Sequence, residues 1–161
     1  MNRTLRPLAL ALTFAVPVMF AGCTSDTTAA PAATIEQTTF ASALGVNLAA
    51  MTRTEAGVYR RDLVVGTGAE VVRAQNLSVR YTGWLANGTE FDSNPSPKPL
   101  FVFRLGSGQV IAGWDDGIAG MRVGGRRQLL IPPALGYGRG GNGAIPGNAV
   151  LVFNVEVVTA Q

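Results

Sequence analysis

Two stretches of the chain alternate apolar and polar side chains, and this alternation restricts the possible folds most strongly. One runs from Leu77 to Thr82 and the other from Leu151 to Val157. Successive side chains on a β-strand point to opposite faces, so each stretch predicts a strand with one buried and one wet face. Between them Asn87-Gly88, flanked by apolar residues, is a strong hairpin signal. The pattern predicts an antiparallel sheet.

Only one segment of this region has helical spacing. Its apolar residues share one helical face, and they are Val110, Ile111, Trp114, Ile118 and Met121. Gly120 and Gly124 are expected to end the helix. A mostly antiparallel sheet can cover a single short helix only by curling around it. The predicted fold class is therefore α+β, a curled antiparallel β-sheet wrapped around one short α-helix.

The chain contains no histidine and a single cysteine. These absences exclude Ser-His-Asp and Cys-His nucleophilic sites, together with zinc sites built from histidine or several cysteines. Any catalysis must use carboxylates, hydroxyls, backbone groups and shape. Neither a metal nor another cofactor is predicted.

Residues 1–22 have the layout of a secretory signal. Residues 1–6 carry two arginines, residues 7–20 are apolar apart from Thr13, and the small pair Ala21-Gly22 follows. As a helix, the roughly 16 residues of this stretch would span about 24 Å, short of the ~30 Å hydrocarbon core of a membrane. A signal peptide is therefore predicted, and a transmembrane anchor is the weaker alternative.

The residues Phe20-Ala21-Gly22-Cys23 resemble the bacterial lipobox, in which the cysteine thiol is acylated and becomes the new N-terminus. Phe20 departs from the usual aliphatic residue, and the alternative is a secreted protein with a free thiol. The lipobox interpretation predicts an exported protein attached to the cell envelope by lipid. Thr24, rather than aspartate, favours the periplasmic face of the outer membrane if the cell is Gram-negative.

The charge balance argues against a nucleic-acid partner. Two of the 13 basic residues lie within residues 1–22, which leaves 11 basic against 10 acidic side chains. A chain so close to neutral lacks the clustered basic surface that binding to phosphates requires.

Residues 23–55 are predicted to form a lipid-attached flexible tether before a folded domain at residues 56–161. From Thr24 to Thr39 the sequence is too poor in large apolar residues to bury a core. Gly45 interrupts a set of apolar residues whose spacing allows one short amphipathic helix: Phe40, Leu44, Val46, Leu48 and Met51. This helix either packs on the domain or stays loosely ordered.

Six short runs carry the most specific signal in the domain. They are Val79-Arg80-Tyr81-Thr82-Gly83, Glu90-Phe91-Asp92-Ser93, Phe101-Val102-Phe103, Gly108-Gln109-Val110-Ile111-Ala112-Gly113-Trp114, Gly136-Tyr137-Gly138 and Leu151-Val152-Phe153. In order and spacing they resemble the FKBP-type peptidyl-prolyl cis/trans isomerases, over about two-thirds of the chain from Val58 to Thr159. The resemblance implies an FKBP-like fold and an enzyme that accelerates rotation about X-Pro bonds.

The resemblance also implies a shallow pocket for a prolyl ring over the Trp114 indole. Asp92, Tyr137 and Ile111 would be catalytic, with the Ile111 N–H and the Tyr137 hydroxyl holding carbonyl oxygens. The substrate-binding residues would be Tyr81, Phe91, Phe101, Val110, Trp114, Ile145 and Phe153. The implied partners are proline-containing polypeptides and macrolide inhibitors such as tacrolimus and rapamycin, bound by a monomer.

Such a pocket suits rotation about an amide bond. The rotation faces a barrier of ~18–20 kcal/mol but makes no bond. Water stabilises the planar, charge-separated amide more than the twisted one, so a desolvating aromatic site favours the twisted state. Lowering the barrier by about 5.4 kcal/mol would accelerate rotation about 10⁴-fold. One or two hydrogen bonds plus desolvation suffice for this.

Three details of the predicted site stay open. Phe91 and Asp92 are neighbours, so both reach one pocket only if a bulge interrupts the regular strand. The family often has an arginine that pairs with the aspartate, whereas here either Lys98 substitutes or Asp92 relies on Tyr81 alone. The loop after Tyr137 is one residue short and rich in glycine, which leaves the outer wall of the pocket undefined.

Other functions fit the sequence less well. Residues 136–141 satisfy the dinucleotide pattern G-x-G-x-x-G, but they follow Pro132-Pro133 rather than a strand and open no helix. The main rival is a non-catalytic module with a chaperone role, which binds proline-containing segments or a partner. A purely structural lipoprotein would not need an aromatic pocket. The joint presence of the aromatic set, Asp92 and Tyr137 favours the enzyme.

Overall fold

The computed structural model describes residues 33–161, which belong to one compact unit. The predicted signal peptide, Cys23 and the start of the predicted tether lie outside the described residues. Within the described range, no helix has the length and apolar character needed to cross a membrane.

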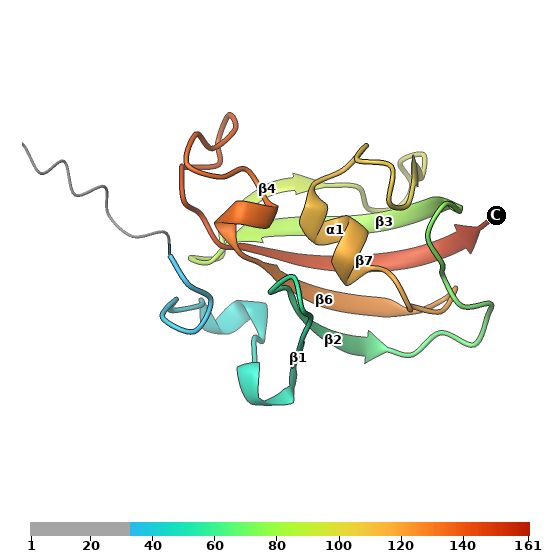
Figure 1. Ribbon diagram of the computed structural model, residues 1–161, viewed down its shortest axis with the longest axis horizontal. Helices are drawn as coiled ribbons and strands as arrows, with labels where there is room; N and C mark the ends of the chain where they lie inside the picture. The colour runs from blue at the N-terminus through green and yellow to red at the C-terminus, as the bar shows by residue number, and fades with distance from the viewer. Residues whose placement is uncertain (1–32) are drawn as a thin grey trace, which may run out of the picture. The chain divides into compact units, whose positions relative to one another are not determined.

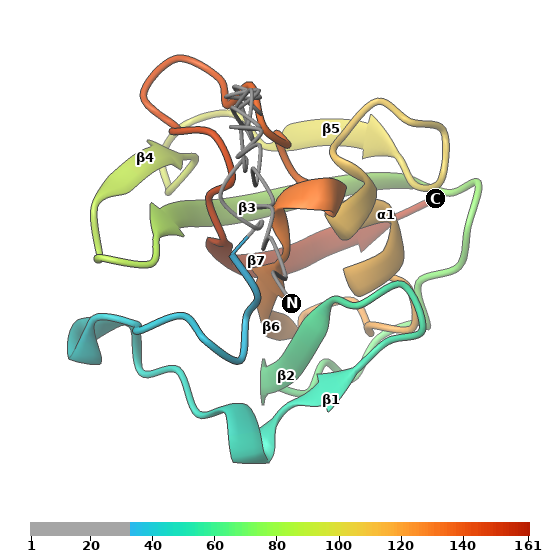
Figure 2. The same cartoon turned by 60° about the vertical axis from the view of Figure 1, so that its left-hand side comes forward.

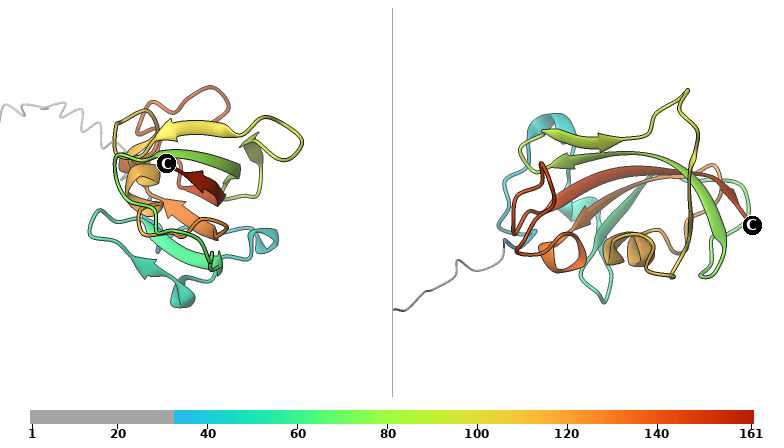
Figure 3. Two further views of the ribbon diagram at one scale, coloured as in Figure 1. Left: turned by 90° about the vertical axis from the view of Figure 1, so that its right-hand side faces the viewer. Right: turned by 90° about the horizontal axis from the view of Figure 1, so that it is seen from above.

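Seven antiparallel strands form one sheet (Figure 1). They are β1 (Thr52–Arg53), β2 (Tyr59–Val64), β3 (Asn76–Leu85), β4 (Glu90–Ser93), β5 (Phe101–Arg104), β6 (Arg126–Ile131) and β7 (Leu151–Ala160). Their order is β1-β2-β6-β7-β3-β4, and β5 pairs with the part of β3 that β4 leaves free. The curved sheet bends around one short helix, α1 (Ala112–Gly117) (Figure 3). This confirms the predicted α+β fold.

The helix presents its predicted apolar face to the sheet. Trp114, Ile118 and Met121 are buried in the main core together with alternate side chains of β3 and β7. The helix lies close to the sheet because Gly113 has no side chain, and a Cβ there would collide with Ile131 on β6. This close approach brings the Trp114 indole among the aromatic rings of the sheet.

The regular helix is shorter than the apolar spacing predicts. It covers only 6 residues, and the chain continues in turns in which the Ile118 N–H donates to Trp114 and the Met121 N–H donates to Ile118. Gly120 follows at φ 77° and ends the segment, as expected. Glycines within the segment lower its helix propensity, which explains why only the first part is an α-helix.

Residues 33–51, here called the strap, pack on the sheet instead of forming a loose tether (Figure 2). Ile35 is only 2% exposed and belongs to a second buried cluster with Leu130, Val150 and Val152. The spacing allowed one amphipathic helix, but the strap contains two 3₁₀ turns separated by Gly45 at φ 58°, namely η1 (Ser42–Leu44) and η2 (Leu48–Ala50). Most of the apolar residues noted in the sequence pack against this second cluster.

Hydrogen bonds fix the strap to the sheet face that points away from α1. The Gln128 side-chain amide donates to the Leu44 carbonyl at 2.8 Å, and the Arg61 guanidinium donates to the Gly45 carbonyl at 2.9 Å. The strap packs on the sheet, rather than forming the predicted flexible tether, because half of this sheet face is apolar and the strap removes it from water. A single isoleucine in a stretch rich in threonine and alanine gives no periodic signal of that role.

Candidate functional site

A hollow of about 400 Å³ opens on the concave side of the sheet, above α1. It is lined by Tyr81, Phe91, Asp92, Phe101, Gln109, Val110, Ile111, Trp114, Tyr137 and Phe153. Nine of the ten predicted site residues are therefore brought together here. The exception is Ile145, which is 7% exposed and belongs to the main core cluster. Gln109 was not among the predicted residues, although it lies in one of the six family-like runs.

Trp114 forms the floor of the hollow. Its side chain is 4% exposed, because rings from the sheet surround it on several sides, yet it contributes to the lining. Tyr81, Phe153 and Phe101 meet the indole edge-on, with ring centroids 5.1, 5.4 and 6.1 Å away. Edge-to-face contacts of this kind fix ring orientation. The indole is thus held rigidly, with part of it open to a guest.

A bulge in β4 directs two neighbouring side chains into the hollow. Across the β3–β4 pair, Gly83 lies opposite Asp92 and Trp84 lies opposite Glu90, so Phe91 is the extra residue. Phe91 and Asp92 consequently both line the hollow, through the bulge that the sequence analysis identified as necessary for this. The Asn87-Gly88 turn that precedes β4 forms the predicted hairpin.

Gly83 lies beneath the aromatic wall. A Cβ at this position would come within 2.5 Å of a Phe153 ring carbon and 2.8 Å of a Phe91 ring carbon. Only glycine lets these two rings lie against β3, where they meet edge-on with centroids 5.5 Å apart. The aromatic wall of the hollow therefore depends on having glycine at position 83.

Tyr81 orients the single carboxylate in the lining. Its hydroxyl donates to Asp92 Oδ2 at 2.7 Å. Burial, followed by this hydrogen bond, raises the pKa of Tyr81 above its ordinary value. Lys98 donates instead to the Ser93 carbonyl at 2.9 Å. Of the two alternatives for the partner of Asp92, the structure thus shows Tyr81.

The wall formed by residues 109–111 is held by the helix that follows it. Asp115 accepts hydrogen bonds from the backbone N–H groups of Gly106 at 2.7 Å and Gly108 at 3.2 Å. Ile111 lies at the N-cap of α1, and its N–H donates to no other described residue. This N–H is therefore available to a guest in the hollow. Sequence reasoning gave Asp115 no role, because its partners are backbone groups.

Tyr137 projects into the hollow from the long loop that precedes β7. Burial, followed by the negative charge of Asp92, raises the pKa of Tyr137 above its ordinary value, so its hydroxyl stays protonated at neutral pH. Residues 136–141 lie in this loop after the 3₁₀ turn η3 (Pro133–Leu135) and lead to no helix. The structural context of a dinucleotide site is thus missing. In the described part of the chain, no cluster of acidic side chains could hold a metal.

A sequence profile of the FKBP-type peptidyl-prolyl cis-trans isomerases matches residues 68–158. The chain belongs to this family. An FK506-binding protein of Neisseria meningitidis serogroup A is 50% identical over 98 residues, which cover 60% of this chain and 90% of the relative. A peptidyl-prolyl cis-trans isomerase of Saccharomyces cerevisiae is 45% identical over 107 residues, but these cover only 26% of that larger protein.

Solved structures of FKBP-type isomerases share the fold. A crystal structure of AtFKBP13 has 39% sequence identity and a TM-score of 0.64, and the match covers 69% of this chain and 98% of the other. An isomerase of Pseudomonas syringae pv. tomato has 32% identity and a TM-score of 0.62, with 70% and 81% coverage. The protein is an enzyme of the FKBP isomerase type, and its ring-lined hollow lies where the family-like runs converge.

Proposed function

We propose that this FKBP-type isomerase holds a prolyl ring over Trp114 and stabilises the twisted X-Pro amide by desolvation and two hydrogen bonds. The observation that carries the proposal is the convergence of an apolar aromatic lining with two donors, the Ile111 N–H and the Tyr137 hydroxyl. A twisted amide has lost its resonance and is less charge-separated, so a dry aromatic wall favours it over the planar form.

Asp92 has an indirect part in this mechanism. Its carboxylate is oriented by Tyr81, and its charge helps to raise the pKa of Tyr137. The Tyr137 hydroxyl, protonated at neutral pH like any tyrosine, keeps its proton to a higher pH than usual and can donate to a carbonyl oxygen. A donor that strengthens its hydrogen bond as the amide twists lowers the barrier, and about 1.4 kcal/mol is needed for each tenfold gain in rate.

Exchange spectroscopy on a short proline peptide tests the activity. Residues 33–161 should accelerate cis/trans exchange, and the combined variant Tyr137→Phe plus Asp92→Ala should return the rate to background. Tyr59→Phe is the matched control, because Tyr59 bonds to Glu36 on the strap, away from the hollow. A background rate for the folded wild type would instead favour the rival, a module that binds proline-containing segments without catalysis.

We further propose that macrolides occupy the same hollow. The relatives from Neisseria are named FK506-binding proteins, and the hollow here has an aromatic floor for an apolar ring and a backbone donor for a carbonyl oxygen beside it. Tacrolimus or rapamycin should therefore abolish the exchange activity. Full activity in the presence of saturating rapamycin would contradict a single shared site.

We also propose that the enzyme is exported and tethered by lipid on Cys23, so that its domain meets unfolded clients at the membrane surface. The basic start, the apolar stretch and the lipobox-like Phe20-Ala21-Gly22-Cys23 support this proposal. Labelled fatty acid should enter the wild type and a Ser25→Ala control, but not Cys23→Ser. Equal labelling of Cys23→Ser would exclude lipid attachment at this thiol and leave the secreted alternative.

A further inference from the structure

The sheet has a second hollow on the face that points away from α1. It has a volume of about 370 Å³, close to that of the ring-lined hollow, and we call it the outer groove. Most of its lining comes from alternate positions on three neighbouring strands, namely Arg80, Thr82 and Trp84 on β3, Arg126 on β6, and Asn154 and Glu156 on β7, and Tyr81, Pro95 and Ser96 complete it. The strap covers the apolar end of this face, where Trp84 also packs, and leaves the polar end open.

The charged side chains of the outer groove form no ion pair within the described residues. The strand register aligns Arg126, Glu156 and Arg80 in one row across β6, β7 and β3. The described residues contain one ion pair, Asp62 with Arg127, so no member of this row is paired within 4 Å. Arg80 donates one hydrogen bond, to the Lys98 carbonyl. Two guanidinium groups therefore flank one carboxylate and give the row a net positive charge.

One amide oxygen of the outer groove is also unsatisfied. Asn154 lies opposite Thr82 on β3 and Gln128 on β6, and its Oδ1 atom is buried without a hydrogen-bond donor. Buried polar atoms are rarely left without a partner. Because Oδ1 is covered, a guest reaches it only if the Asn154 amide turns toward the groove that its side chain lines. A guest must supply acceptors for the two arginines, and it can rest an apolar group against Trp84.

We propose that the outer groove binds an extended, acidic segment of polypeptide that need not contain proline. The carboxylate side chains of such a segment supply acceptors for Arg80 and Arg126, and its backbone N–H groups can donate to Asn154 once that amide turns. A nucleic-acid backbone offers phosphate acceptors but few donors, and its regularly spaced charges cannot avoid Glu156 in the middle of the row, whereas a peptide can place an uncharged residue there. The groove thus forms a client-binding site separated from the ring-lined hollow by the thickness of the sheet.

This placement lets one client engage both faces. Tyr81 contributes to the lining of both hollows, while its neighbours Arg80 and Thr82 line only the outer groove. A client with an acidic segment some distance from its proline would bind at two linked points, which raises its effective concentration at the catalytic site. Such a client should show a lower KM than the proline segment alone, with kcat unchanged.

Titration of the isotope-labelled full chain tests the proposal by nuclear magnetic resonance. The probe is a proline-free heptapeptide of alternating glutamate and valine, and its counterpart has glutamine in place of glutamate. The acidic peptide should shift the amide signals of Arg80, Thr82 and Asn154, more weakly as salt is added. Exposed ion pairs are individually weak, so Arg80→Gln plus Arg126→Gln should raise its Kd about fivefold to tenfold.

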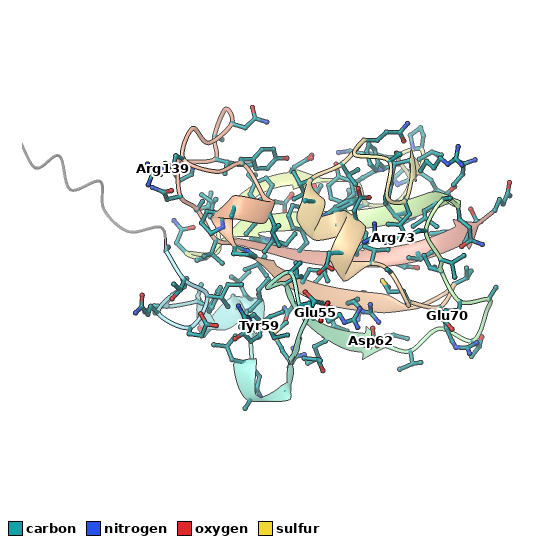
Figure 4. All side chains as sticks on the ribbon, in the orientation of Figure 1. Glu55, Tyr59, Asp62, Glu70, Arg73 and Arg139 are labelled. Carbon is teal, nitrogen blue, oxygen red and sulfur yellow. The ribbon has the colours of Figure 1, made fainter. Side chains whose placement is uncertain are left out.

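Arg139→Gln is the matched control, because it removes the same charge from the loop before β7 (Figure 4). It should leave the Kd for the acidic peptide unchanged, and the double arginine variant should keep wild-type exchange activity on a short proline peptide. Saturation with rapamycin should also leave the Kd unchanged. Isomerase activity is measured separately, so its absence would not affect the result for the groove.

Four outcomes would overturn the proposal. These are absence of shifts on the outer face, equal binding of the glutamine peptide, equal loss of affinity in Arg139→Gln, and displacement of the acidic peptide by rapamycin. Vesicles containing phosphatidylglycerol provide a further arm. Binding to these vesicles through Arg80 and Arg126, without binding of the acidic peptide, would assign the groove to a lipid surface instead.

Discussion

Asp92 lies within reach of two phenol groups whose ionisation it opposes. Burial and the negative charge of Asp92 raise the pKa of both Tyr81 and Tyr137, while the hydrogen bond to Glu36 is the largest cause of the raised pKa of Tyr59. The chain has only these three tyrosines. Each of them should therefore be less than half ionised at pH 10 in the folded protein, whereas a tyrosine in a peptide would be about half ionised there.

Ultraviolet titration of tyrosinate checks this expectation, and the same shifts set the sign of a stability effect. A tyrosine whose pKa is higher in the folded state contributes stability that is complete below its unfolded value near 10 and is lost as pH rises above it. The free energy of unfolding should fall above pH 10, less steeply in Tyr81→Phe. Isomerase activity should persist up to pH 10. A tyrosinate inflection at pH 10 would contradict these shifts.

Asp115 is expected to act as a positioning residue. Its carboxylate bonds to two backbone N–H groups in the loop that leads to Ile111. Asp115→Ala should lower kcat/KM about tenfold, which corresponds to about 1.4 kcal/mol of transition-state stabilisation. Asp115→Asn keeps one acceptor and should lose less.

Asp116→Ala is the control for this prediction, because Asp116 accepts a hydrogen bond from Thr54 and has no contact with the loop. Stopped-flow kinetics measure kcat/KM, and circular dichroism verifies folding. If Asp115→Ala and Asp116→Ala lost activity equally, the effect would be attributed to the helix as a whole rather than to the position of Ile111.

At the scale of elements, the strap is expected to be part of the folded domain. Ile35 is almost fully buried against β6 and β7. Ile35→Ala should lower the free energy of unfolding by about 2–5 kcal/mol, because it leaves a cavity in a closely packed cluster. Val64→Ala, at a side chain that is 47% exposed, is the control and should cost far less.

Urea denaturation measures both changes. A cost below about 0.5 kcal/mol for Ile35→Ala, as for an ordinary surface substitution, would show that the strap is dispensable. The structure also explains why a domain cut at residue 56 is a poor choice for activity measurements. Such a cut would uncover the apolar face formed by Leu130, Val150 and Val152.

Three local features differ in how well they could be predicted from the sequence: the β4 bulge, the strap and the partner of Asp92. The β4 bulge was predictable, because Phe91 and Asp92 are adjacent and both were needed in one pocket. For residues 40–51 the sequence left open whether they pack on the domain, and the burial of Ile35 was not predictable, because a single isoleucine carries no period. The partner of Asp92 was likewise left open, since the choice between Lys98 and Tyr81 depends on side-chain reach within a loop.

At the scale of the whole molecule, the fold follows from patterns that a sequence displays well. Strand alternation, one hairpin and one helical face were enough to predict a sheet curled around a helix. The outer groove could not be predicted, because its row of charges depends on the register of three strands far apart in the chain. Ile145 was assigned to the pocket by resemblance alone, and in the structure it belongs to the main core cluster and is not among the residues that line the hollow.

The position of β7 has a consequence for how the enzyme is made. β7 follows every other strand along the chain, yet it pairs with β6 on one side and β3 on the other. While a ribosome is still adding residues, the two halves of the sheet have nothing to join them, and Phe153 is missing from the aromatic wall. A growing chain therefore has no place for a prolyl ring, and activity should arise in one step when β7 emerges.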